Sequence, residues 1–355
     1  MLGLVGISAK DTYNVTILGA TGAVGRAMIQ TLERRHFPVA RLLLLASGKS
    51  AGTVLQFSGR DIPVIDAEEA DFSGTDIALF SAGADASRSY AGRMVSAGAV
   101  VIDNSSAYRM DESVPLVVPE VNPEAVFYNR GIISNPNCST IQLVVALNPL
   151  KQLGIDSVYL STYQAVSGMG QKGINGLLNA GIEDDIFPLP GKHRHYPMEY
   201  NVLPQCDAFT GNGYTLEEIK IVNESRKILS MPDLRISPTA VRVPVIRGHS
   251  ESVLVRFRNE VKPEHVREIL AASPGIIVAD DIKNEVFPHP RMAESTGDVY
   301  IGRIRQDLSD SRAIWMFVVA DNILKGAAWN AVQIAELLAG SRSDGKESIK
   351  IPEER

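Results

Sequence analysis

From residue 14 to about 133 the chain alternates short apolar runs with longer amphipathic stretches, and this alternation restricts the possible fold more than any other feature. Runs that are apolar throughout are typical of strands buried on both faces of a parallel sheet. The stretches 24–35 and 86–97 lie between such runs and are predicted to be helices. This order predicts a doubly wound α/β domain. The runs are 15–18, 42–45, 77–80 and 100–102.

A glycine-rich turn, Gly19-Ala20-Thr21-Gly22-Ala23-Val24-Gly25, directly follows the first predicted strand and opens the first predicted helix. Glycines at such a turn let the backbone approach a pyrophosphate that lies on the helix N-terminus. The spacing is G-x-x-G-x-x-G rather than the usual G-x-G-x-x-G, and a motif alone is weak evidence. Its position between strand and helix favours a dinucleotide site over a turn without a ligand.

The end of the second predicted strand indicates which dinucleotide is bound. A site for NAD normally has an Asp or Glu here, which binds the ribose hydroxyls. This chain instead reads Ala46-Ser47-Gly48-Lys49-Ser50, without an acid. A lysine between hydroxyl groups suits a 2′-phosphate, so NADP is predicted, although Lys49 is equally compatible with a solvated loop.

After residue 138 the pattern changes. Several predicted strands alternate apolar and polar residues, as strands of an antiparallel sheet with one covered face do. Helices are predicted at 214–229, 264–272 and 327–338. The second half is therefore predicted to be an α+β domain with a mixed or antiparallel sheet. Its predicted strands are 158–163, 241–245, 252–256, 299–304 and 314–319.

Composition narrows the class of protein. The 355 residues include 35 Lys and Arg against 41 Asp and Glu, a net charge of −6, which argues against a nucleic-acid scaffold. Two cysteines indicate a reducing compartment. No apolar stretch reaches the roughly 18 residues of a membrane span, and the start has no charged segment before its short apolar part. We expect a cytoplasmic enzyme without a membrane or nucleic-acid partner.

Cys138 is the best candidate for a nucleophile. It lies in Ser134-Asn135-Pro136-Asn137-Cys138-Ser139-Thr140, between an apolar run and the helical pattern 141–150. The positive end of a helix and its free N–H groups favour the thiolate, which is the reactive form. The alternative is a small buried core residue. We therefore expect a lowered pKa at Cys138.

His249 follows the predicted strand that contains Arg242, and Gly248 leaves room beside it. A general base near a thiol needs such an arrangement, but a histidine in a surface turn gives the same pattern. His193 and His195 lie in a charged stretch, and no further ligands with matching spacing accompany them. No metal site is predicted.

Three charged residues are candidates for holding a small zwitterion or an anion. Glu217 and Lys220 are three residues apart on a predicted helix and share a face, which also fits an exposed ion pair. Arg109 follows the end of a strand of the first domain, where ligands bind in such sheets. It is either an anion clamp or a structural residue.

Together these residues make the chain resemble aspartate-β-semialdehyde dehydrogenase of the bacterial type, from Val15 to about Gly340. Two positions depart from the family: Lys49 stands where arginine is common, and Cys206 where an aliphatic residue is usual. Lysine keeps the charge but loses the planar fork of arginine. The matching segments are 19–25, 103–106, 134–140, 164–168, 201–207, 213–215, 217–220, 242–252, 302–305 and 321–327.

The resemblance implies NADP-dependent reductive dephosphorylation of 4-phospho-L-aspartate to L-aspartate 4-semialdehyde through a cysteine thioester, on the route to lysine, threonine and methionine. It implies that Cys138 forms the acyl-enzyme, His249 is the acid/base and Gln164 helps to orient the intermediate. Substrate would contact Arg242, Glu217 and Asn137, and phosphate would contact Arg109 and Lys220. NADP would contact Gly19, Thr21, Gly22, Ala23, Val24, Ser47, Lys49, Ser167, Gly168 and Asn322.

The same resemblance divides the chain into an NADP-binding domain, 14–138 with a closing helix 322–340, and a catalytic and dimerisation domain, 139–321. We expect flexible ends at 1–13 and 341–355, and a homodimer or homotetramer. One alternative is N-acetyl-γ-glutamyl-phosphate reductase, whose cysteine motif usually has Gly where Asn137 stands. The other is a nucleotide-binding relative without catalysis, which the presence of Cys138, His249, Arg242 and Gln164 disfavours.

Overall fold

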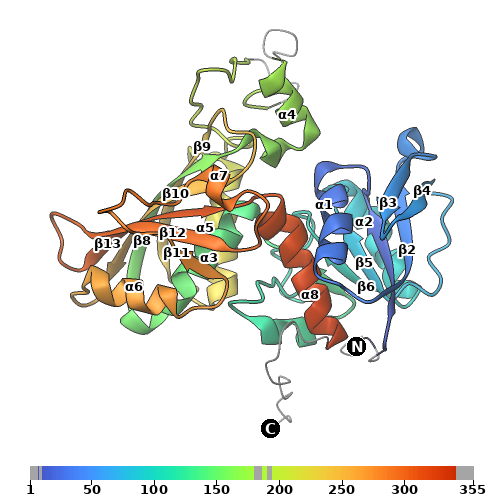
Figure 1. Ribbon diagram of the computed structural model, residues 1–355, viewed down its shortest axis with the longest axis horizontal. Coiled ribbons are helices and arrows are strands. Elements are labelled where there is room, and N and C mark those ends of the chain that lie inside the picture. Colours follow the sequence, from blue (N-terminus) through green and yellow to red (C-terminus); the bar gives the residue numbers. More distant parts are fainter. Residues whose placement is uncertain (1–6, 8–9, 180–185, 190–193, 341–355) are drawn as a thin grey trace.

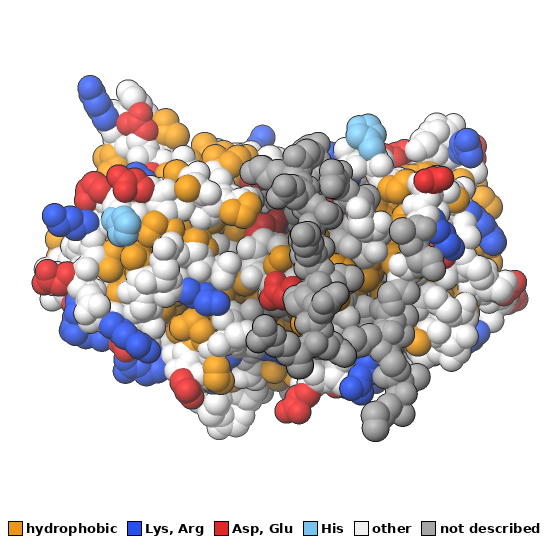
Figure 2. Space-filling view, turned by 90° about the horizontal axis from the view of Figure 1, so that it is seen from below, with side chains coloured by type: hydrophobic (Ala, Val, Ile, Leu, Met, Phe, Trp, Pro, Cys, Tyr) orange, Lys and Arg blue, Asp and Glu red, His pale blue; other side chains and the backbone are white. Residues whose placement is uncertain are grey.

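The computed structural model describes residues 7, 10–179, 186–189 and 194–340. These residues form two sheets, each with its own hydrophobic core (Figure 1). Among them no helix is long and apolar enough to cross a membrane. On the face drawn in Figure 2, side chains of both charges are interspersed with hydrophobic ones.

The first sheet has seven strands among the described residues, in the order β3-β4-β2-β1-β5-β6-β7. All neighbours pair in parallel except the hairpin of β3 and β4. All residues of β5 and β6 are buried, which explains the apolar runs at 77–80 and 100–102. The strands are β1 Tyr13–Leu18, β2 Val39–Ala46, β3 Val54–Phe57, β4 Arg60–Asp66, β5 Ile77–Phe80, β6 Val100–Asp103 and β7 Ile132–Ser134.

Helices cover both faces of this sheet, which confirms the doubly wound fold. Helix α2 (Ala84–Ser96) packs on one face, and α1 (Ala23–Arg34) and α8 (Trp329–Ala339) pack side by side on the other (Figure 1). The chain end therefore returns to the first sheet. The hydroxyl of Tyr13 in β1 donates to the carbonyl of Ala339 at 3.0 Å.

The second sheet has six described strands in the order β11-β12-β13-β10-β8-β9. It is mixed, because β8 pairs with β9 and β11 with β12 in parallel while the other pairs are antiparallel. The strands are β8 Ile155–Gln164, β9 Arg235–Arg242, β10 His249–Phe257, β11 Ile276–Val278, β12 Val299–Gln306 and β13 Ala313–Ala320.

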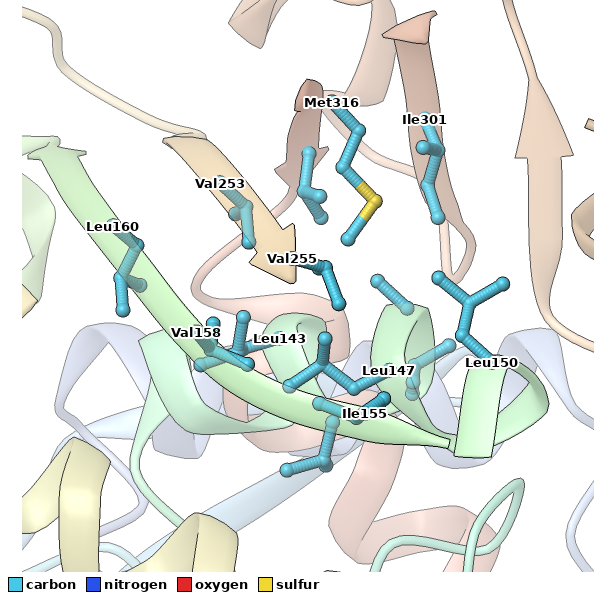
Figure 3. Close-up of a cluster of buried hydrophobic side chains, with 14 of the residues drawn as sticks. Leu143, Leu147, Leu150, Ile155, Val158, Leu160, Val253, Val255, Ile301 and Met316 are labelled. Atoms are coloured by element: carbon cyan, nitrogen blue, oxygen red, sulfur yellow. The ribbon is translucent and has the colours of Figure 1, made fainter. Parts of the chain in front are cut away.

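Helix α3 (Cys138–Leu147) lies at the centre of the second domain. Its residues from Ile141 to Leu147 are all buried, and a helix that is hydrophobic all round belongs in a core. Leu143 and Leu147 point into the cluster formed with Val158, Val253 and Met316 (Figure 3). This core fixes α3, and with it the position of Cys138. Helices α5 (Leu216–Leu229) and α6 (Pro263–Ala271) contribute to the same cluster.

The remaining described helices are short. They are η1 Gly48–Ser50, η2 Pro123–Tyr128, η3 Asn148–Leu153, η4 Val166–Met169, α4 Gln171–Leu178, α7 Pro290–Ala293 and a π-helical turn, Leu324–Ala328, that leads into α8.

The sequence missed or misplaced some elements. The hairpin β3–β4 was not predicted, because its residues are mostly exposed and form no continuous apolar run. A strand was predicted at 241–245, but β9 ends at Arg242. Tyr13 was expected in a flexible end, yet it is buried in β1 against Phe37. The expectations for 341–355 and for most of 1–13 lie outside the described residues.

Candidate active site

A pocket of about 390 Å³ lies where the carboxyl ends of β1, β5, β6 and β7 face the second domain. Open parallel sheets bind ligands at this edge. Twelve of the site residues expected from the sequence line the pocket. They are Val24, Arg109, Asn137, Cys138, Gln164, Ser167, Gly168, Glu217, Lys220, Arg242, His249 and Asn322.

Cys138 and His249 meet in this pocket. The sulfur of Cys138 lies 3.2 Å from Nε2 of His249. Cys138 is the first residue of α3, and the side chain of Asn137 caps that helix by accepting from the amides of Ser139 and Thr140. His249 is not in a surface turn after a strand, since it is the first residue of β10 and is fully buried. The pair has the geometry of a nucleophile and its partner.

The backbone fixes the orientation of the His249 ring. The amide of Ala165 donates to Nδ1 at 3.0 Å, so a neutral ring carries its proton on Nε2, the atom that faces sulfur. Burial, together with the positive charge of Arg242, lowers the pKa of His249 to about 3. At neutral pH the ring is therefore uncharged and presents an N–H to Cys138.

The expected low pKa of Cys138 is wrong for this arrangement of side chains. Burial raises the pKa of the thiol to about 12, and the negative charge of Glu217 acts in the same direction. Arg109, Arg242 and the amide of Ser139 oppose this shift without cancelling it. The helix N-terminus alone does not set the pKa of the Cys138 thiol. The carboxylate of Glu217, which lies on another helix, also acts on that pKa and raises it.

Arg242, the last residue of β9, brings a buried positive charge into the pocket. Its Nη1 donates to the carbonyl of Ala165 at 2.8 Å, while its Nε is buried without a hydrogen-bond partner. Among the described residues no carboxylate lies within ion-pair distance of it. A buried charge without a partner is costly, so this guanidinium is prepared for an anionic ligand group.

Glu217, in the first turn of α5, is a buried carboxylate with three partners. It accepts from Asn137 Nδ2 at 2.8 Å, from Gln164 Nε2 at 3.1 Å and from Lys220 Nζ at 3.3 Å. Burial opposes ionisation, but Lys220 and the two amides outweigh it and lower the pKa of Glu217 to about 2. Glu217 and Lys220 do share a helix face, and that face lines the pocket rather than the surface.

Arg109 is anchored through all three of its nitrogen groups. Nε donates to the carbonyl of Asn135 at 3.0 Å, Nη2 to that of Asn104 at 2.7 Å, and Nη1 to Glu224 at 3.1 Å. Glu224 was not predicted from the sequence, and its other oxygen accepts from the amide of Asn137 at 2.6 Å. It follows Glu217 by seven residues on the same face of α5, and this spacing is the signal that could have revealed it.

The glycine turn between β1 and α1, of which Val24 lines the pocket, suits a dinucleotide. Gly19 has φ +85°, and a Cβ on it would lie 2.8 Å from the backbone of Ser81. A Cβ on Gly25 would lie 2.2 Å from the carbonyl oxygen of Gly19, so only glycine permits this close contact of helix and strand. Helix α1 begins after Gly22 without a side-chain cap, which leaves its first amides available to a phosphate.

Further candidate cofactor residues come from other segments of the chain. The side chain of Asn322 bonds to Ser167 and accepts from the amide of Gly248 at 2.9 Å. Lys49, in η1 just after β2, is exposed and has no carboxylate partner among the described residues. The residues present therefore fit NADP. No metal-binding group of three ligands occurs in the described part of the chain. His193 lies outside it, and His195 contacts the carbonyl of Leu189.

Two family models match most of the chain. One, described as "Semialdehyde dehydrogenase, NAD binding domain", matches residues 14–128, and the other, "Semialdehyde dehydrogenase, dimerisation domain", matches 147–325. Aspartate-semialdehyde dehydrogenase of Bacillus subtilis is 47% identical over 335 residues, covering 92% of this chain and 97% of its own. The enzyme of Aquifex aeolicus is 51% identical over 333 residues, covering 92% and 98%.

Solved structures agree with these relatives. Aspartate semialdehyde dehydrogenase II of Vibrio cholerae, complexed with ASA, superposes with a TM-score of 0.87 at 45% identity and covers 94% of this chain and 99% of its own. The Candida albicans enzyme with NADP has a TM-score of 0.72 at 28% identity and covers 92% and 98%.

Proposed function

The chain belongs to the aspartate-semialdehyde dehydrogenase family, and we propose that its pocket performs the family reaction with Cys138 as the nucleophile. This family interconverts 4-phospho-L-aspartate and L-aspartate 4-semialdehyde in amino-acid biosynthesis. The observation that carries the assignment of Cys138 is its 3.2 Å contact with His249, beside the guanidinium of Arg242, which has no carboxylate partner among the described residues.

In the biosynthetic direction the sulfur of Cys138 attacks the acyl carbon of the phosphorylated substrate. The new carbon–sulfur bond replaces the carbon–oxygen bond to phosphate, which leaves with its electron pair and takes up the proton that the thiol loses. In the opposite direction phosphate attacks the thioester and frees the thiolate. When the cofactor is bound, NADPH would supply the hydride that reduces the thioester carbon, and NADP would accept it in the opposite direction.

His249 acts on the charge that develops during these steps. The resemblance implies that His249 is an acid/base. In this arrangement its ring can only donate a hydrogen bond to the reacting groups, because the lone pair of Nδ1 already accepts from the amide of Ala165. The Nε2–H stabilises the thiolate and then the oxygen of the tetrahedral intermediate.

The pocket recognises the charged groups of the amino-acid substrate through side chains of opposite charge. Arg242 provides a planar pair of donors for the substrate carboxylate, and Glu217 provides the negative charge for its ammonium group. Asn137 and Gln164 both donate to Glu217, so they hold that carboxylate in place. Gln164 lies in the same pocket as Cys138 and orients the bound intermediate.

Phosphate binds between Arg109 and Lys220, the two other cations of the pocket. Each of the two terminal nitrogens of Arg109 makes one contact and retains a second N–H for the anion. The cofactor is NADP. The turn 19–24 would hold its pyrophosphate, Ser47 and Lys49 its 2′-phosphate, and Ser167, Gly168 and Asn322 its nicotinamide end.

We further propose that residues 14–138 and 322–340 form the NADP-binding domain and 139–321 the catalytic and dimerisation domain. The core shared by α1 and α8 supports this division. A homodimer would form through the sheet face opposite α3, where Tyr159, Leu254 and Phe317 remain partly exposed. Two free thiols, Cys138 and Cys206, fit a cytoplasmic location.

The test is an assay of NADPH formation from aspartate semialdehyde, phosphate and NADP, with NAD in a parallel arm. Cys138→Ala should abolish turnover and keep NADPH binding. The matched control is Cys206→Ala, which removes the other thiol outside the pocket and should keep most activity. Wild-type turnover in Cys138→Ala would refute the assignment, and equal rates with NAD would refute the NADP preference.

A further inference from the structure

The ammonium group of Lys220 makes ion pairs with two carboxylates of the pocket. Its Nζ lies 2.6 Å from Oδ2 of Asp207 and 3.3 Å from Oε2 of Glu217. Both Lys220 and Asp207 line the pocket, and their side chains are only 28% and 32% exposed. Burial alone would lower the pKa of Lys220, but the two carboxylates outweigh it and raise that pKa. Lys220 is therefore a charged group that is shared between two anions.

The two carboxylates differ in how firmly they are held. Glu217 also accepts from the amides of Asn137 and Gln164, so it keeps partners if Lys220 moves. Among the described residues, Lys220 is the single cation within ion-pair distance of Oδ2 of Asp207. Asp207 is the anion that depends on Lys220.

The loop around Asp207 holds its carboxylate at the pocket. Asp207 has φ +71°, a left-handed conformation that aspartate and asparagine adopt more readily than most residues. Its Oδ1 accepts from the amide of Ala208 at 2.8 Å, and its backbone carbonyl accepts from Gln205 at 3.2 Å. The neighbouring Cys206 is buried. The local backbone thus directs the second oxygen, Oδ2, towards Lys220.

We propose that Asp207 is an internal counter-ion of Lys220, which inorganic phosphate, or the phosphate group of the substrate, must replace on binding. The proposal rests on the proposed function, because that function assigns phosphate to Lys220. A phosphate dianion that approaches Lys220 is repelled by the Asp207 carboxylate at close range. Asp207 therefore weakens phosphate binding and reclaims Lys220 when phosphate leaves.

The variant to test is Asp207→Asn, because asparagine tolerates the left-handed backbone and can still accept from Ala208. The KM for phosphate should fall roughly three- to tenfold, and product inhibition by phosphate in the biosynthetic direction should tighten by the same factor. The KM values for aspartate semialdehyde and NADP should stay within about twofold. Asp233→Asn, at an exposed site outside the pocket, is the matched control and should change none of these values.

A double-mutant cycle shows whether the effect passes through Lys220. In a Lys220→Gln background, Asp207→Asn should no longer lower the KM for phosphate, since the cation that both anions share is gone. A KM that falls equally in both backgrounds would overturn the counter-ion role, as would an unchanged or higher KM in Asp207→Asn alone.

Direct titration with inorganic phosphate separates this proposal from the proposed function. Calorimetry should show tighter phosphate binding to Asp207→Asn than to the wild type, whether or not turnover is measured. Wild-type protein without phosphate-dependent NADPH formation would contradict the proposed function, while equal phosphate affinities in the titration would contradict the counter-ion.

Discussion

Gly326→Ala tests how closely the turn before α8 packs against the nucleophile. Gly326 lies in the π-helical turn, and a Cβ on it would be 2.8 Å from Cβ of Cys138 and 3.3 Å from its Cα. Ordinary contact begins near 3.4 Å, so the turn or the start of α3 must move by about 0.6 Å. Neither side moves freely, because the turn and the residues of α3 after Cys138 are buried.

The expected cost follows from this displacement. Overpacking of a buried contact typically costs about 1–3 kcal/mol, which lowers Tm by a few degrees in a protein of this size. Misplacement of a reacting atom by 1 Å can reduce the rate on the order of 100-fold. For a shift of about 0.6 Å we expect kcat to fall roughly 10- to 50-fold, and alkylation of Cys138 by iodoacetamide to change with it.

Steady-state kinetics, thermal unfolding and alkylation rates measure these effects. The control is Gly92→Ala in α2, where a Cβ meets no atom within 4 Å and should leave kcat unchanged. A Gly326→Ala variant with wild-type kcat would refute the reasoning. So would a loss of kcat with unchanged thiol reactivity, because the displaced group would then not be Cys138.

Three further predictions concern charge. Because the thiol pKa is about 12, the rate of alkylation of Cys138 in the enzyme without ligands should keep rising up to at least pH 10. Glu217→Gln should accelerate alkylation at pH 8, and a plateau of the wild-type rate near pH 7 would contradict this prediction. Arg242→Lys should raise the KM for aspartate semialdehyde roughly 10- to 100-fold, because lysine loses the planar fork of donors; an unchanged KM would exclude carboxylate binding there. Burial raises the pKa of Glu251 well above its usual 4.5, so the folded chain keeps a proton that the unfolded chain loses, and stability should fall as pH rises above about 4.5. Glu251→Gln should remove this loss, which a higher urea midpoint than wild type at pH 8 but not at pH 5 would show.

The local sequence pattern was sufficient to predict a strand where all of its residues are buried. All four residues of β5 are buried, and the apolar run 77–80 predicted that strand with its correct bounds. The glycine turn was equally informative, because the close contacts of Gly19 and Gly25 allow no side chain. In contrast, β3 has one buried residue among four, and its sequence resembles a loop.

The properties that could not be predicted from the sequence depend on contacts between segments that are distant in the chain. The motif around Cys138 predicted its place at a helix start, but the thiol pKa depends on Glu217, which another helix supplies. Glu224 acquires its role only when α5 packs against the turn 134–138, and Asp207 only when the loop before α5 meets Lys220 on that helix. No spacing within one element predicts which cation or amide these carboxylates reach.

The closing position of α8 affects how the protein is made. Its Trp329 stacks against Arg35 at the end of α1, and its Glu336 pairs with the same arginine at 2.6 Å. Ribosomes add about 5–20 residues per second, so roughly 15–60 s separate the synthesis of α1 from that of α8. During that time the nascent chain exposes the apolar side of α1 that α8 later covers. The first domain to emerge is thus the last to be completed, and molecular chaperones can bind it throughout this interval.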